Sequence, residues 1–179
     1  ILLAVSNHHA NLVPWQFVAK QTGAAVKFIY LNKSGTLDIN DFKAKLSSKT
    51  KVVANSSVVN ATGIINPVEE VIKLSHESGA VVVVDAAQAI AHYKQDVSAL
   101  DCDFLVFSGH KIFSDFGVGV LYGKKELLDK MPPFLYGGDM INFVTEESSE
   151  FKEAPYKYEG GTHDTAAIVS LKHAIEYIE

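Results

Sequence analysis

The stretch Val81-Val82-Val83-Val84-Asp85-Ala86-Ala87-Gln88 decides the fold class of this chain. Four consecutive valines predict a strand that is buried on both of its faces, as strands are in a parallel sheet covered by helices. Just upstream, Pro67 begins a helical pattern with its apolar residues on one face, and Gly79 ends it. A helix that leads into a buried strand is typical of an α/β protein.

The same alternation of apolar runs and helical patterns continues on both sides of this stretch. The run at 118–122 follows the run at 103–107 too closely for a helical crossover, so we expect these two strands to be antiparallel. The pattern as a whole predicts an α/β fold with a mostly parallel sheet flanked by helices. The predicted strands are 25–30, 51–55, 81–84, 103–107 and 118–122; the predicted helices run from Asn11 to Gly23, from Asp38 or Asn40 to Leu46, from Pro67 to Gly79, over 124–130 and over 165–178; and 132–159 is expected to be mostly irregular.

Composition excludes several classes of protein. Of the 179 residues, 47% are hydrophobic, which is enough for a packed core and excludes a disordered chain. The single cysteine, Cys102, excludes a disulfide framework and is typical of a cytoplasmic protein. No apolar run is long enough to cross a bilayer, and a net charge of −5 argues against a nucleic-acid surface.

All 16 basic residues are lysines, so the chain has no arginine to grip a carboxylate or phosphate. An acidic ligand must therefore be held by lysine, histidine and backbone N–H groups, or by groups outside this chain. The sequence lacks an initiator methionine, opens inside an apolar stretch and stops within a predicted helix. We expect it to be an excised part of a longer protein.

Polar residues follow three of the predicted strands, at the ends where ligands gather in parallel sheets. A lysine amine forms Schiff bases, an aspartate would hold a proton on a pyridine nitrogen, and serine and histidine suit phosphate oxygens. Pyridoxal phosphate requires these groups together. The residues at the strand ends are Asn60, Asp85, Gln88, Ser108, His110 and Lys111.

Each of these residues also has a structural interpretation when it is taken alone. An aspartate after a strand is most often a turn or helix cap, and a lysine is most often a solvated surface residue. His8 is by default a surface residue, and Cys102 is by default a small buried one. From the residues alone, both the cofactor site and the structural interpretation stay open.

Four motifs in order resemble the class V aminotransferase family of pyridoxal-phosphate enzymes, closest to its SUF-type cysteine desulfurases and selenocysteine lyases. The resemblance implies the large, cofactor-binding domain of PLP-dependent transferase fold type I over residues 1–179. It extends through 100–104 and 131–141, and 26 residues separate Asp85 from Lys111. The four motifs are NHHAN at 7–11, VPW at 13–15, VDAAQA at 84–89 and FSGHK at 107–111.

The resemblance implies catalytic roles for two residues. Lys111 would form the Schiff base with pyridoxal 5'-phosphate and then move protons, and His8 would stack on the cofactor ring and help proton transfer. Asp85 would pair with the ring nitrogen. The implied reaction converts L-cysteine to L-alanine and leaves a persulfide on the enzyme.

The remaining implied roles concern binding of the cofactor and of partners. Gln88 and Asn60 would lie at the ring hydroxyl, and Ser108 and His110 would hold the phosphate. Thr162 matches a residue that reaches the phosphate of the neighbouring subunit, which implies a homodimer. The resemblance further implies a sulfur-acceptor protein and a role in iron–sulfur cluster assembly. We expect no metal site, and the composition predicts no nucleic-acid or membrane partner.

Two stretches depart from the family pattern. The family's Gly-Pro-Thr-Gly turn after the lysine is Ser114-Asp115-Phe116-Gly117 here, and its Thr-Pro-Asn is Thr162-His163-Asp164. The family's nucleophilic cysteine and carboxylate-binding arginine belong to a C-terminal domain outside these residues, and Cys102 does not match the nucleophile's position.

Three alternatives remain open at this point. Another class V activity, namely a transaminase, an epimerase or a kynureninase-like hydrolase, would use the same cofactor. The isolated domain would be a catalytically silent module if it needs the missing segments. A doubly wound nucleotide-binding domain is disfavoured because no glycine-rich phosphate motif follows any strand.

Overall fold

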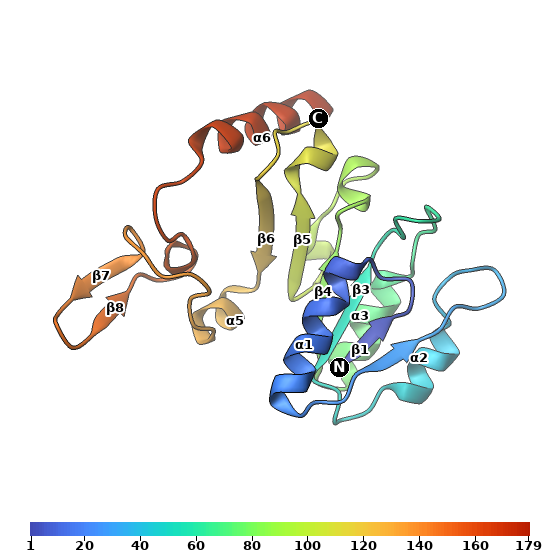
Figure 1. The fold of residues 1–179 in the computed structure, drawn as a ribbon. Helices are drawn as coiled ribbons and strands as arrows, with labels where there is room; N and C mark the ends of the chain where they lie inside the picture. The colour runs from blue at the N-terminus through green and yellow to red at the C-terminus, as the bar shows by residue number, and fades with distance from the viewer.

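A six-stranded sheet organises the chain in the computed structural model, which describes residues 1–179 (Figure 1). The strands lie side by side in the order β2-β1-β3-β4-β5-β6, and a separate pair, β7-β8, forms a hairpin. The elements are β1 (Leu2–Ala4), η1 (His9–Asn11), α1 (Val13–Thr22), β2 (Lys27–Ile29), α2 (Ile39–Lys45), β3 (Val52–Ser56), α3 (Val68–Glu77), β4 (Val81–Asp85), η2 (Ala89–Ala91), α4 (Val97–Leu100), β5 (Phe104–Ser108), η3 (Gly109–Ile112), β6 (Gly119–Gly123), α5 (Lys125–Lys130), β7 (Ile141–Val144), β8 (Ser149–Phe151), η4 (Tyr156–Tyr158) and α6 (Thr165–Ile178).

The pairing of the strands confirms the predicted α/β class. β2, β1, β3, β4 and β5 are mutually parallel, whereas β6 runs antiparallel to β5, as the short connection between them requires. The register places Ser56 beside Asp85 and Asp85 beside Val106. The carboxyl ends of the three central strands therefore share one edge of the sheet.

The main core lies between the sheet and the helices α2 and α3. Val82 and Val84 of β4 project into it and are almost fully buried, as are Phe42 of α2 and Val71 of α3. The amphipathic pattern of α3 explains its position, because its apolar face needs the apolar face of the sheet. This layer fixes the spacing of the strands that carry the polar residues.

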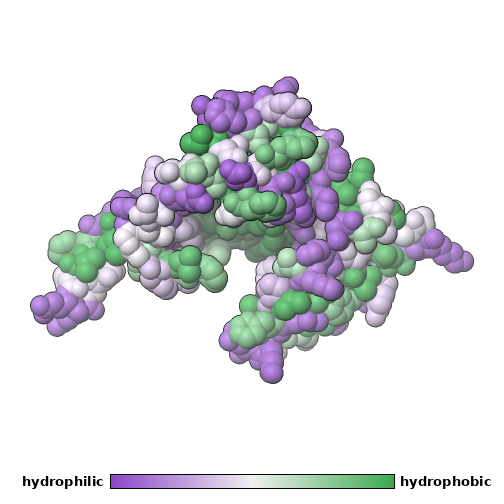
Figure 2. Space-filling model, turned by 45° about the horizontal axis from the view of Figure 1, so that its top comes forward, coloured by the Kyte–Doolittle hydropathy of each residue, from purple (hydrophilic) through white to green (hydrophobic).

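The opposite face of β4 is less covered than the four valines predict. Val81 and Val83 are only partly buried, so the strand is not buried on both faces and that expectation is wrong. In Figure 1, α1 lies in front of the sheet, on the other side from α3. Only Ala19 of α1 is buried, so this helix covers its face loosely. Figure 2 shows a hollow with hydrophobic residues on its floor.

The prediction that α1 begins with Asn11 as its N-terminal residue is also wrong. Asn11 ends the short helix η1, and Leu12 occupies the N-cap position of α1 without a side-chain hydrogen bond. The Asn11 side chain instead accepts a hydrogen bond from Nε1 of Trp15, at 3.0 Å. At α2 the prediction left two residues open, and Asp38 is the cap, because its carboxylate accepts from two backbone N–H groups.

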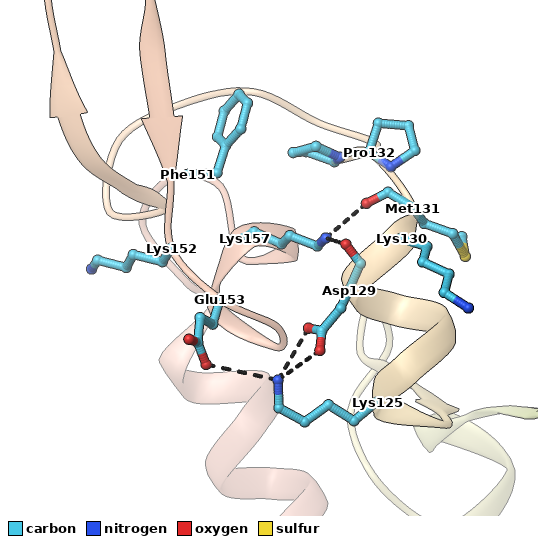
Figure 3. A pocket seen from close by; sticks show the side chains of 10 residues that line it. Lys125, Asp129, Lys130, Met131, Pro132, Phe151, Lys152, Glu153 and Lys157 are labelled. Carbon is cyan, nitrogen blue, oxygen red and sulfur yellow. Dashed lines mark hydrogen bonds and ion pairs between the residues drawn. The ribbon is translucent and has the colours of Figure 1, made fainter.

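The segment expected to be irregular contains the β7-β8 hairpin, which projects away from the sheet (Figure 1). The chain that follows the hairpin is held in place by η4, which hydrogen-bonds to the C-terminal turn of α5 (Figure 3). The buried Nζ of Lys157 donates to the carbonyls of Asp129 and Met131, at 2.9 and 2.8 Å. The hydroxyl of Tyr158 donates to the carbonyl of Leu128, at 2.6 Å. The carbonyls at the C-terminal end of a helix lack their usual intrahelical partners, so Lys157 acts as a cap for the carbonyls of Asp129 and Met131.

Charged groups join four elements at the amino edge of the sheet. The buried carboxylate of Asp103 accepts the backbone N–H of Val82, at 2.7 Å, and contacts Nε2 of His76, at 2.9 Å. Nζ of Lys124 lies 3.1 Å from Asp103 and 2.7 Å from Asp101. This cluster lies at the opposite edge from the predicted ligand site.

No helix of the chain has the length and apolar character to span a membrane.

Candidate active site

A cavity of about 560 Å³ lies at the carboxyl ends of β3, β4 and β5. This volume is within the usual range for a small-molecule site. Val83 is among its lining residues, which explains why that face of β4 is not fully packed. The cavity gathers these residues predicted from the sequence: His8, Asn60, Asp85, Gln88, Ser108, His110 and Lys111.

Asp85 is held at the end of β4 by two hydrogen bonds. Its Oδ2 accepts from Oγ of Ser56, at 3.1 Å, and its Oδ1 accepts the backbone N–H of Ala87, at 3.0 Å. No lysine or histidine of the chain lies within ion-pair distance of this carboxylate. A partly buried carboxylate without a cation favours a positively charged ligand group beside it.

Lys111 lies in η3, directly after β5, and its side-chain amine forms neither an ion pair nor a hydrogen bond within the chain. The first residue of η3, Gly109, packs so tightly that a Cβ atom there would lie 2.8 Å from Cγ1 of Val118. The Gly109 N–H also donates to the carbonyl of Val118, at 2.8 Å. This contact with the strand entry of β6 fixes η3, and with it the position of the lysine, at the cavity.

One residue that the sequence analysis gave no role, Asn7, connects the loop after β1 to the site. The buried amide of Asn7 donates to the carbonyl of Ala54, at 2.9 Å, and accepts the N–H of Ser56, at 3.0 Å. Asn7 therefore ties the loop that carries His8 to β3. Nδ1 of His8 in turn accepts the N–H of Ala10, at 3.1 Å. The place of Asn7 as the first residue of the NHHAN motif was the one available signal.

His110 is exposed and lines the cavity, and the ring of Phe116 stacks on its imidazole. The ring centroids are 5.4 Å apart and the planes are inclined by 26°. Phe116 belongs to the stretch that departs from the family pattern, and the sequence analysis did not predict this contact.

Thr162 is the one candidate that the cavity does not include. It is exposed, in the segment between η4 and α6. The N–H of the neighbouring Gly161 donates to the carbonyl of Gly138, at 3.0 Å, which holds this segment against the base of the hairpin. Its expected role toward a neighbouring subunit stays a prediction.

Cys102 is fully buried, as the structural interpretation predicts. Burial raises the pKa of its thiol above the ordinary value of 9.0, so the reactive thiolate is disfavoured. It does not line the cavity.

A second cavity, of about 600 Å³, lies between α5 and the β7-β8 hairpin (Figure 3). Its Lys125 pairs with Asp129, at 2.8 Å, and with Glu153, at 3.7 Å, while Lys157 is bound to helix carbonyls. Lys130 and Lys152 also line this cavity, but its carboxylates, Asp129 and Glu153, both pair with Lys125, so it holds no carboxylate without a cation. We therefore place the chemistry at the strand ends.

The sequence of the chain matches the family described as "Aminotransferase class-V" over residues 1–179. The chain belongs to the aminotransferase class-V family. Relatives within this group include a "Probable cysteine desulfurase" of Treponema pallidum (strain Nichols), 58% identical over 100% of the chain, and one of Halalkalibacterium halodurans, 48% identical over 100% of the chain. The chain covers 44% of each of these two relatives, so it spans less than half of their length.

Solved structures of two cysteine desulfurases have the same fold. The cysteine desulfurase CsdA from Escherichia coli superposes with a TM-score of 0.96 at 40% identity, over 99% of this chain and 44% of CsdA. The apo cysteine desulfurase from Thermococcus onnurineus NA1 superposes with a TM-score of 0.93 at 37% identity, also over 99% of this chain and 44% of that one.

Proposed function

We propose that residues 1–179 form the cofactor-binding domain of a pyridoxal-phosphate-dependent cysteine desulfurase. One observation carries this proposal: a single cavity at three parallel strand ends contains a carboxylate without a cation and an amine without an anion. The relatives named above, which the chain matches over its whole length, support it further.

The residues of the cavity fit pyridoxal phosphate. Asp85 would bind the ring nitrogen and keep a proton on it, and Lys111 would bind the aldehyde carbon. Ser108 and His110 would donate to the phosphate, and Gln88 would donate to the ring hydroxyl. Pyridoxal phosphate supplies, when bound, a carbonyl that condenses with amines and a ring that accepts electrons from the substrate carbon.

The other residues of the site act on the substrate. The amine of Lys111, once exchanged for the amino group of L-cysteine, would take and return protons at the substrate carbon. His8 would cover the ring face and Asn60 would orient the substrate near the ring hydroxyl. The thiol that accepts sulfur must lie outside these residues, because Cys102 is buried away from the cavity.

Further parts of the proposal concern the complete protein. We infer a homodimer in which Thr162 reaches the partner's phosphate, a protein that accepts the sulfur for iron–sulfur cluster assembly, and a cytoplasmic location. The family's implied pairing of subunits supports the first, and the single buried cysteine supports the last.

Selective covalent labelling of Lys111 tests the proposal. The complete natural chain is incubated with pyridoxal phosphate, reduced with borohydride and digested, and the modified lysine is identified by mass spectrometry. We expect Lys111 to be modified first, and the Lys111→Ala variant to lose both this modification and the formation of alanine from L-cysteine. Lys94→Ala, outside the cavity, serves as the control and should retain both.

Two results would contradict the proposal. Modification spread evenly over the surface lysines would show that the cavity does not select the cofactor. A 2-oxo acid formed in place of alanine would move the activity to the transaminases of the family.

A further inference from the structure

Phe116 has an unusual environment for a large apolar side chain. Its ring is 83% exposed, yet one face stacks on the imidazole of His110. The centroid separation of 5.4 Å and the inclination of 26° are in the range of offset-stacked aromatic pairs. The ring therefore shields an imidazole that is itself an exposed part of the cavity wall.

The loop that carries Phe116 is fixed at both ends. On one side, the N–H of Asp115 donates to Oγ of Ser170 on α6, at 2.8 Å. On the other side, the carbonyl of Val118 accepts the N–H of Gly109, at 2.8 Å. Gly117 has a φ of +93°, which an L side chain rarely adopts, so the turn after Phe116 requires glycine. These restraints place the Phe116 ring against His110.

We infer that Phe116 is a positioning residue for the phosphate end of the site, because its ring holds the imidazole of His110 in the orientation that binds the anion. This inference rests on the proposed function. A free histidine side chain on the surface samples several rotamers, and ordering it on binding opposes affinity. Because the stack already orders the His110 side chain, less entropy is lost when the anion binds, and the anion binds more tightly.

The Phe116 ring also strengthens the hydrogen bond between the His110 imidazole and the anion. An apolar face over one side of the imidazole excludes water from that side, and hydrogen bonds to an anion are stronger where water is excluded. The family's Gly-Pro-Thr-Gly turn has no aromatic ring at this position, so the contribution belongs to the Phe116 of this chain. We therefore expect Phe116 to increase the affinity for ligands that carry a phosphate and to leave the affinity for ligands without one unchanged.

The test compares Phe116→Leu, which keeps an apolar side chain without a ring, with Phe116→Tyr, which keeps the ring. The first measurement is the NMR shift of the His110 Cε1–H group in the complete natural chain. We expect the ring-current shift to disappear in Phe116→Leu and to persist in Phe116→Tyr. A His110 signal that is the same in the wild type and in Phe116→Leu overturns the stack.

The second measurement is the affinity for pyridoxal phosphate and for pyridoxal, which lacks the phosphate. Phe116→Leu should bind pyridoxal phosphate about two- to tenfold more weakly, while its affinity for pyridoxal is unchanged. Phe116→Tyr should restore the wild-type ratio of the two affinities. An equal loss for both ligands, or no loss for either, overturns the positioning role.

Inorganic phosphate separates this inference from the proposed function. The shift of the His110 signal on addition of phosphate measures anion binding without any Schiff base. Weaker phosphate binding in Phe116→Leu than in the wild type supports the inference even if pyridoxal phosphate fails to modify Lys111. Equal phosphate binding overturns it even if Lys111 is modified. Phe143→Ala, an exposed ring on the hairpin, is the control and should leave the His110 signal in place.

Discussion

A single amide in the core, Asn55, lies buried without a hydrogen bond. Asn55 is 1% exposed on β3, beside Val84 of β4. Neither Nδ2 nor Oδ1 of its side chain has a partner within the chain. A buried polar group without a partner lowers stability by about 1–3 kcal/mol. This residue therefore weakens the sheet that carries the site.

We predict that Asn55→Val stabilises the protein. Valine removes the unpartnered amide, prefers strands and fits beside Val84, so the free energy of unfolding should rise by about 1–2 kcal/mol. The measurement is chemical denaturation followed by circular dichroism.

Asn66→Val is the matched control for this substitution. Asn66 is equally buried, but its Nδ2 donates to the carbonyl of Ser56, at 2.8 Å, and its Oδ1 accepts the N–H of Leu37, at 3.4 Å. Its replacement should destabilise the protein because two buried backbone groups lose their partner. If the two substitutions lower stability equally, the amide of Asn55 is satisfied in solution and the prediction is wrong.

At the scale of elements, the charge cluster at the amino edge joins α3, β4, β5 and β6. Hydrogen bonding to Lys124, followed by its charge, holds the pKa of Asp101 below its ordinary value of 3.8. Burial disfavours the charged form of Lys124, but hydrogen bonds to Asp101 and Asp103 outweigh this and raise its pKa above 10.5. Both shifts mean that the ion pairs favour the folded state.

The signs of these shifts define a pH window for the cluster. The Asp101 contribution is present above pH 3.8 and is lost as the pH falls through its lowered pKa. The Lys124 contribution is present below pH 10.5 and is lost as the pH rises through its raised pKa. The pairs therefore stabilise the fold fully between these values and weaken outside them.

Lys124→Met should lower the free energy of unfolding at neutral pH by about 1.5–3 kcal/mol, because the buried Asp103 loses a charged partner. The difference from the wild type should shrink below pH 3.8 and above pH 10.5. The measurement is denaturation across this range of pH. Lys125→Met is the control, since Lys125 is exposed and its pair with Asp129 should contribute little at any pH. A difference that does not change with pH would assign the effect of Lys124 to packing.

Most of the regular elements could be predicted from the sequence because their residues pack on the core, but the short elements β1 and α4 are not among those predicted. β4 and β5 end within one residue of their predicted ends, since valine and phenylalanine runs reflect burial. The hairpin could not be predicted, because β7 and β8 are mostly exposed and have no apolar face to reveal them. The predicted start of α1 at Asn11 is wrong because the Asn11 side chain hydrogen-bonds to Trp15 instead of to the helix backbone.

At the scale of the whole molecule, strand order brings the candidate residues together. The rule that ligands gather at carboxyl ends was sufficient to predict Asp85 and Lys111 on one cavity, because β4 and β5 are neighbours in the sheet. The bonds of Asn7 to β3 and the stack of Phe116 on His110 depend on how loops meet after folding. Apart from the place of Asn7 in the NHHAN motif, no local pattern in the sequence encodes those contacts.

Binding at this cavity should stabilise the whole molecule, since the ligand contacts groups from β3, β4, β5 and η3 only when the sheet is folded. A ligand at 100 times its dissociation constant stabilises a fold by about 2.7 kcal/mol. We predict that pyridoxal phosphate raises the melting temperature, and that Asp85→Asn reduces this rise by weakening binding about tenfold, or about 1.4 kcal/mol. The measurement is thermal denaturation with and without the ligand.

The charge of Asp85 is the variable that this substitution isolates. Asparagine keeps an oxygen that accepts the hydrogen bond of Ser56 or of Ala87, so the melting temperature without ligand should stay close to that of the wild type. Asp96→Asn is the control: Asp96 caps α4 outside the cavity, and asparagine caps helices equally well. Asp96→Asn should keep the full rise. If Asp85→Asn also keeps it, the carboxylate does not face a charged group of the ligand, and the proposed orientation of the ring in the cavity is wrong.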